Sequence, residues 1–116
     1  ILQPHDGLCG QACVAMLAGI TLEETINIMH CSEWQATIAK IIGALNYFGL
    51  EHSEEIVYTC GKTDEVVLPK CAVILEKMGR FSHYLVTFDG KFYDPNLGVM
   101  EQYDLSKMKG YLEVLV

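Results

Sequence analysis

The chain has 116 residues, of which 51% are hydrophobic, and its formal net charge at pH 7 is −7. This length predicts a single domain, residues 1–116, with enough apolar side chains for a core. The acidic net charge disfavours nucleic acids as binding partners. No apolar run approaches the ~18 residues of a transmembrane helix, which disfavours insertion into a membrane.

A helical apolar pattern covers residues 9–18, close to the N-terminus. Asp6 is a candidate cap for this helix, and Gly19 is a typical residue for its end. The pattern therefore predicts a helix whose first turn contains Cys9.

Two further helices are indicated by capping-box patterns at residues 21–24 and 32–35. The first pattern predicts a short helix that runs to about Met29. The second predicts a longer helix that is closed by Gly49. The apolar residues of this longer helix recur at helical spacing: Ile38, Ile41, Ile42, Leu45 and Phe48.

The second half of the chain is rich in β-branched and aromatic residues, which favour strands. The predicted strands are residues 56–60, 71–75, 81–88, 91–93 and 111–116. Because helices come first and strands follow, the order predicts an α+β fold with an antiparallel sheet.

The dipeptide Asp89-Gly90 is typical of a two-residue hairpin turn. Pairing outward from this turn places His83 and Asp94 on one face of the sheet as diagonal neighbours, with backbones roughly 7–8 Å apart. A carboxylate at this distance can reach an imidazole nitrogen. Asn96 lies directly opposite His83 in this register and is an alternative partner for the imidazole.

Cys9 and Gln3 carry the other candidate functional groups. A helix N-terminus favours the reactive thiolate form of cysteine, and Gly10 leaves room for a substrate backbone. The amide of Gln3 is a donor of the kind that stabilises an oxyanion. A buried cysteine or a strand histidine is usually structural when it occurs alone, but Gln3, Cys9, His83 and Asp94 together predict thiol acyl chemistry.

Four segments carry a resemblance to a known family. They are "QPHDGLCGQACVAML", "GITLEETINIM", "TIAKIIGALNYFGLE" and "CAVILEKMGRFSHYLVTFDGKFYDPNLG". In this order they resemble the bacterial papain-like cysteine peptidases that remove double-glycine leaders from bacteriocins. The resemblance covers most of the chain and implies a papain-like α+β fold, with N-terminal helices packed on an antiparallel sheet.

Carried over by position, the resemblance implies a Cys-His-Asp triad. Cys9 would be the nucleophile that forms an acyl-enzyme, His83 the base and later the acid, and Asp94 the residue that orients His83. Gln3 and the backbone N–H of Cys9 would hold the oxyanion. The implied partner is a peptide or protein substrate, with no cofactor and no metal, and no pattern indicates which residues bind it.

Two alternatives for the function remain open. The family usually has Asp before the catalytic Cys, and this chain has Leu8. This departure and the short chain favour a papain-like effector or toxin domain that deamidates or cleaves a target-cell protein. A catalytically inactive leader-binding module is the other alternative, although the complete set of four residues argues against it.

The remaining cysteines bear on metal binding and location. Cys9, Cys13 and the pair at residues 30–31 are too sparse for a zinc site, and no Cys-x-x-Cys pair is present. Five cysteines at irregular spacing favour reduced thiols and a cytoplasmic location. Because the sequence begins with Ile1 and not Met, we expect it to belong to a larger protein.

Overall fold

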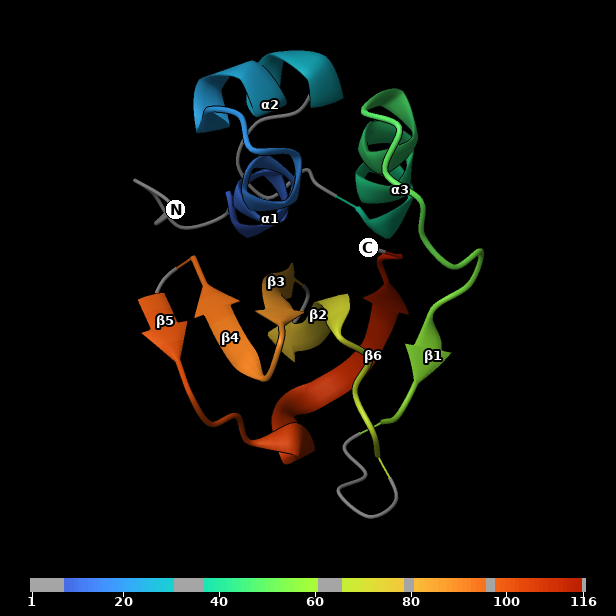
Figure 1. The fold of residues 1–116 in the computed structure, drawn as a ribbon, viewed down its shortest axis with the longest axis vertical. Helices are drawn as coiled ribbons and strands as arrows, with labels where there is room; N and C mark the ends of the chain where they lie inside the picture. The colour runs from blue at the N-terminus through green and yellow to red at the C-terminus, as the bar shows by residue number, and fades with distance from the viewer. Residues whose placement is uncertain (1–7, 31–36, 61–65, 79–80, 96–97, 116) are drawn as a thin grey trace.

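The computed structural model describes residues 8–30, 37–60, 66–78, 81–95 and 98–115. Within them, three helices lie over one face of a six-stranded antiparallel sheet with the strand order β1-β6-β2-β3-β4-β5 (Figure 1). The helices are α1 (Cys9–Ala18), α2 (Leu22–Met29) and α3 (Ile38–Tyr47). The strands are β1 (Val57–Tyr58), β2 (Cys71–Met78), β3 (Phe81–Phe88), β4 (Lys91–Asp94), β5 (Gly98–Met100) and β6 (Met108–Glu113), with a short 3₁₀ helix, η1 (Leu105–Lys107), before β6. The predicted α+β class is confirmed.

Helix α1 has the predicted bounds. Gly19 ends it in the left-handed region, at φ 70°, and donates its N–H to the carbonyl of Ala15. The N-cap position is held by Leu8 rather than Asp6, and Leu8 provides no side-chain cap. Asp6 lies outside the described residues.

Helices α2 and α3 each begin with a threonine cap. The hydroxyl of Thr21 accepts the N–H of Glu24 at 3.1 Å, as the capping box predicted. The hydroxyl of Thr37 accepts the N–H of Lys40 at 3.3 Å. Helix α3 therefore begins after Thr37, later than predicted, and the pattern at residues 32–35 lies outside the described residues.

The hairpin between β3 and β4 has the predicted register. Asp89 and Gly90 both have positive φ, 52° and 82°, which suits a tight two-residue turn. Thr87 pairs with Phe92 across the two strands. The hairpin thus sends alternate side chains of both strands to the same face, as predicted.

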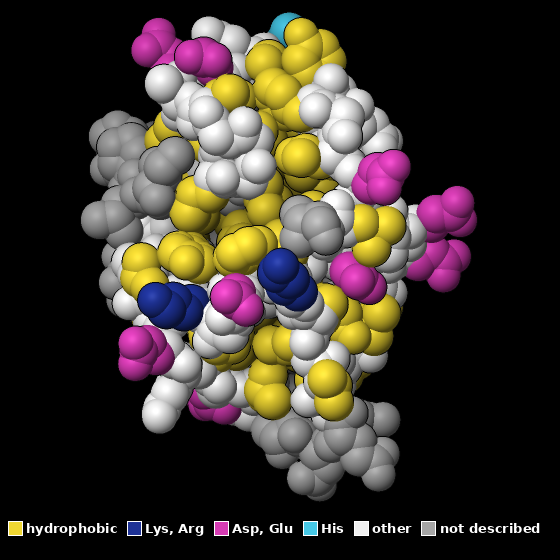
Figure 2. All heavy atoms as spheres, in the orientation of Figure 1, with side chains coloured by type: hydrophobic (Ala, Val, Ile, Leu, Met, Phe, Trp, Pro, Cys, Tyr) yellow, Lys and Arg dark blue, Asp and Glu magenta, His cyan; other side chains and the backbone are white. Residues whose placement is uncertain are grey.

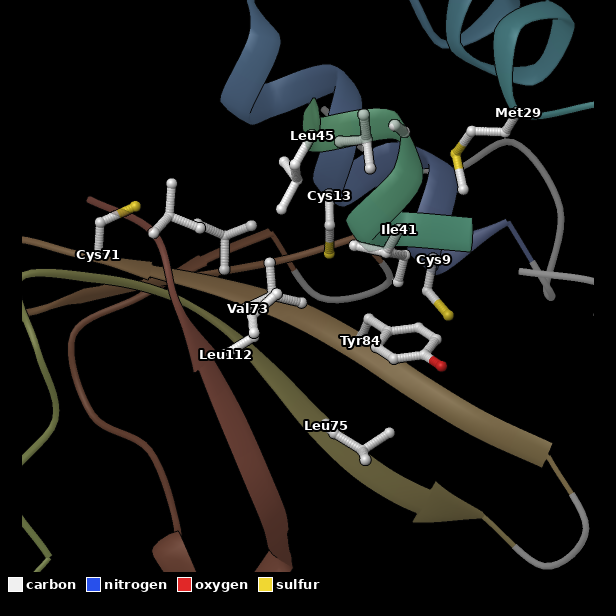
Figure 3. Close-up of a cluster of buried hydrophobic side chains, with 14 residues drawn as sticks. Cys9, Cys13, Met29, Ile41, Leu45, Cys71, Val73, Leu75, Tyr84 and Leu112 are labelled. Carbon is white, nitrogen blue, oxygen red and sulfur yellow. The ribbon is translucent and has the colours of Figure 1, made fainter. Parts of the chain in front are cut away.

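Two apolar clusters cover the two faces of the sheet. Beneath the helices, side chains from α1, α2 and α3 meet side chains from β2, β3 and β6 (Figure 3), and the labelled members are Cys9, Cys13, Met29, Ile41, Leu45, Cys71, Val73, Leu75, Tyr84 and Leu112. A smaller cluster on the other face is centred on Ile74, Leu85 and Met108. Each large apolar side chain that is fully buried contributes about 1.5–3 kcal/mol to folding.

Among the described residues, no single helix is long and apolar enough to cross a membrane. Helices α1 and α2 reach that length only together, as a pair bent by 111°.

Candidate active site

Cys9 is the first residue of α1 and is 4% exposed. The free N–H groups of the first turn and the helix dipole place positive potential at this end of the helix. The sulfur of Cys9 points from the end of α1 toward the sheet, close to Tyr84 of β3 (Figure 3). The structure thus places this thiol at a helix start, as the sequence predicted.

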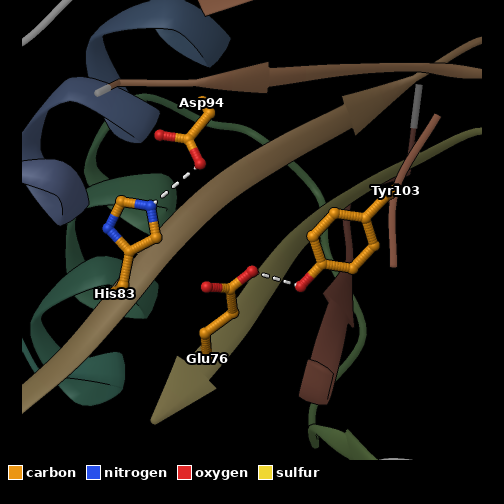
Figure 4. Close-up of polar contacts among 4 residues, drawn as sticks. All are labelled: Glu76, His83, Asp94 and Tyr103. Atoms are coloured by element: carbon orange, nitrogen blue, oxygen red, sulfur yellow. Dashed lines mark hydrogen bonds and ion pairs between the residues drawn. The ribbon is translucent and has the colours of Figure 1, made fainter. Parts of the chain in front are cut away.

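His83 of β3 and Asp94 of β4 are in direct contact. Nε2 of His83 lies 3.1 Å from Oδ2 of Asp94, and both side chains are buried (Figure 4). The contact between His83 and Asp94 that was predicted from the hairpin register is therefore present. Asn96, the alternative partner, lies outside the described residues.

The imidazole of His83 also interacts with Cys9. Burial lowers the pKa of His83, but hydrogen bonds to Asp94 and Cys9 and the negative charges of both groups outweigh burial and raise it from 6.5 to about 10. Because Nε2 binds Asp94, Nδ1 is the ring nitrogen left for the thiol. The His83 imidazole thus lies between the sulfur of Cys9 and the carboxylate of Asp94 and interacts with both.

The strand pairing explains how His83 reaches both neighbours. The pairing between β3 and β4 ends at Val86 and Tyr93, so His83 lies beyond the paired part of the hairpin. On its other side, β4 pairs with β5 through Asp94 and Gly98. Asp94 is therefore fixed by the sheet, and His83 turns to it from the neighbouring strand.

The other described cysteines lie in different surroundings. Burial, together with the charges of Cys9 and Asp94, raises the pKa of the Cys13 thiol well above its ordinary value. Burial also raises the pKa of Cys71, while Cys60 is exposed. Cys13 and Cys71 are thus held as neutral thiols.

A second polar pair, which no sequence pattern predicted, lies next to His83. The hydroxyl of Tyr103 donates a hydrogen bond to Oε2 of Glu76, which is paired with His83 across β2 and β3 (Figure 4). The predicted strand 71–75 ended one residue before Glu76, and Tyr103 precedes η1 in a segment without a strand or helix pattern. A longer prediction for β2 would have placed a carboxylate opposite His83.

An apolar cavity of about 630 Å³ opens between the sheet and the end of α1 that is remote from Cys9. Figure 2 shows hydrophobic side chains gathered in the hollow between the helices and the sheet. Its walls include Met16, Leu17, Val86, Phe88 and Tyr93. Tyr93 directly precedes Asp94, so the cavity adjoins the strand that carries the carboxylate.

The catalytic roles of Cys9, His83, Asp94 and Gln3 stay predictions. Gln3 lies outside the described residues, so its role as oxyanion donor remains a prediction. Among the described residues, no three His, Cys, Asp or Glu side chains are grouped so that they could hold a metal ion.

A comparison with solved structures identifies a protein of similar fold. No family model matches the sequence, and no curated protein matches it. A crystal structure of a double glycine motif protease from an AMS/PCAT transporter, in complex with the leader peptide, superposes with a TM-score of 0.73 at 20% identity. The match covers 98% of this chain and 88% of the protease. The chain therefore has the papain-like α+β fold of that protease.

Proposed function

We propose that the chain is a cysteine peptidase that cleaves a peptide bond through Cys9, His83 and Asp94. The observation that carries this proposal is the position of the His83 imidazole, which is hydrogen-bonded to both Asp94 and Cys9. A thiol, a base and a group that orients the base are the parts that nucleophilic acyl transfer requires. The fold shared with a double-glycine protease supports the same chemistry.

The reaction follows from the roles of these groups. The thiolate of Cys9 attacks the carbonyl carbon, and the backbone N–H of Cys9 and the amide of Gln3 donate hydrogen bonds to the oxyanion. His83 then gives its proton to the leaving amine, which leaves a thioester on Cys9. Water, deprotonated by His83, attacks the thioester and releases the acid, and the Cys9 thiolate and protonated His83 are restored. Asp94 accepts the Nε2–H of His83 throughout and keeps Nδ1 directed at the sulfur.

The substrate that we propose is a peptide with apolar side chains. The apolar cavity beside β4 offers space for such side chains. The structurally similar protease was crystallised in complex with the leader peptide, so a double-glycine leader is the first substrate to examine. A reactive thiol persists in a reducing compartment, and we propose a cytoplasmic location on that ground.

The test is cleavage of peptides by matched variants. A panel that includes double-glycine leaders is incubated with the wild type, Cys9→Ala and Cys13→Ala, and the products are identified by mass. We expect the wild type and Cys13→Ala to cut the same bond, because Cys13 is a neutral, buried thiol on the same helix. Cys9→Ala removes the nucleophile and should give no product.

Cleavage by Cys9→Ala at the wild-type rate would contradict the proposal. A protein substrate that changes mass only by deamidation, and only when Cys9 is present, would favour the effector alternative, because the same groups can attack a side-chain amide. Binding of a leader without any product would favour the inactive module.

A further inference from the structure

Two carboxylates flank His83 in the sheet. Strand β3 lies between β2 and β4, and Asp94 of β4 is hydrogen-bonded to the imidazole. Glu76 of β2 is paired directly opposite His83. Directly opposite residues project to the same face with Cβ atoms roughly 4.5–5.5 Å apart. The side chain of Glu76 is therefore long enough to reach the imidazole in competition with Asp94.

Glu76 is bound to Tyr103 instead. The Tyr103 hydroxyl donates to Oε2 of Glu76, and in Figure 4 the ribbon of β3 runs between this pair and the pair formed by His83 and Asp94. The ring of Tyr103 is stacked on Phe92, with centroids 5.2 Å apart and planes inclined by 23°. Phe92 belongs to β4, two residues before Asp94. Tyr103 is thus held on the strand that carries Asp94 and directs its hydroxyl at Glu76.

The charged groups around this pair keep Tyr103 a hydrogen-bond donor. Burial, the hydrogen bond to Glu76 and the charges of Glu76, Asp94 and Asp104 all raise the pKa of Tyr103. The hydroxyl therefore stays protonated over the working range of pH and can hold the carboxylate throughout. The described titratable groups that act on His83 itself are Asp94 and Cys9, with Glu76 next to it in the ladder.

We propose that Tyr103 is a positioning residue, which holds Glu76 away from the imidazole of His83 and leaves Asp94 as the carboxylate that orients the ring. The proposal rests on the proposed function, in which His83 must present Nδ1 to the sulfur of Cys9. A released Glu76 would compete with Asp94 and Cys9 for the two N–H groups of the imidazolium. It would also make His83 a weaker acid toward the leaving amine.

The activity test uses a conservative change and its suppressor. Tyr103→Phe removes the donor hydroxyl but keeps the ring that stacks on Phe92. We expect it to lower kcat for peptide cleavage by about tenfold with little change in KM, since part of the acid–base contribution is lost. Adding Glu76→Gln should restore kcat, because a neutral amide is no ionic partner for imidazolium. Tyr111→Phe, in a half-buried tyrosine of the same apolar cluster, is the matched control and should act as wild type.

A second measurement does not depend on activity. In Cys9→Ala protein, the titration of His83 is followed by NMR with isotope-labelled histidine. We expect Tyr103→Phe to raise the pKa of His83 by about one pH unit, because a second carboxylate favours the imidazolium. Glu76→Gln added to Tyr103→Phe should cancel the rise, and Tyr111→Phe should leave the titration unchanged.

Either of two results would overturn the role of Tyr103: an unchanged His83 titration in Tyr103→Phe, or a loss of kcat that Glu76→Gln fails to restore. If the wild type cuts no peptide, the proposed function fails by itself. The titration in the Cys9→Ala background still decides whether Tyr103 holds Glu76 away from His83.

Discussion

At the scale of single residues, the proton on His83 controls the candidate site. Its raised pKa, about 10, depends on the carboxylate of Asp94 and on Cys9. The imidazolium therefore persists below about pH 10 and is lost as the pH rises through that value. A protonated His83 next to Cys9 supports the thiolate and supplies the proton for the leaving amine.

Asp94→Asn tests this dependence. The substitution removes the negative charge and the acceptor of the Nε2–H, so the pKa of His83 should fall toward its ordinary value. We expect the alkaline limb of kcat/KM for peptide cleavage to move down by about one to three pH units. The pH profile of the wild type is the reference, and an alkaline limb at the same pH in both proteins would show that Asp94 does not set the proton affinity.

Only one of the two polar contacts at the site could be predicted from the sequence. The contact between His83 and Asp94 follows from one local turn, because Asp89-Gly90 fixes the register of the hairpin. The hydrogen bond between Tyr103 and Glu76 could not be predicted from the register of a hairpin. Tyr103 approaches β2 only because the chain folds back after β5. No short-range sequence pattern predicts this course of the chain.

At the scale of elements, strand β6 shows how packing overrides propensity. The predicted strand was 111–116, whereas β6 begins at Met108 and includes Gly110. Glycine weakens a strand signal, so the sequence pattern began after it. The structure needs a glycine there because a Cβ at Gly110 would lie 2.7 Å from the carbonyl oxygen of Val57 on β1.

Gly110→Ala should therefore separate β1 from β6. We expect a loss of about 1–3 kcal/mol in the free energy of unfolding, as for other overpacked sites. Gly43→Ala in α3 is the matched control, because a Cβ there meets nothing within 4 Å and a helix interior gains about 0.5–1 kcal/mol from the change. Urea unfolding measures both variants, and equal effects of the two would contradict the steric account.

Other elements differ from prediction for similar physical reasons. Strand β5 was missed because it has three residues and begins at Gly98 with φ 88°. Strand β1 is shorter than predicted and is exposed at the edge of the sheet. The helices and the β3–β4 hairpin were predicted more closely, because their caps and turn residues are local signals.

At the scale of the whole molecule, folding brings the end of α1 onto a sheet formed by the second half of the chain. The order of helices and strands predicted the α+β class, and the family resemblance implied that the helices pack on the sheet. The meeting of Cys9 with His83 depends on how α1 lies across β3. No spacing in the sequence specifies this placement, and the meeting was expected only because the four residue types together suit thiol acyl chemistry and because of the family resemblance.

The most direct test of the central claim is the reactivity of Cys9. The wild type and His83→Ala are treated with one equivalent of iodoacetamide near neutral pH, and the modified cysteines are mapped by mass. We predict that Cys9 of the wild type reacts ahead of exposed Cys60 and of Cys13, whose pKa is raised, and that His83→Ala loses this preference. Faster modification of Cys60 in the wild type, or an equal rate at Cys9 in both proteins, would contradict the account.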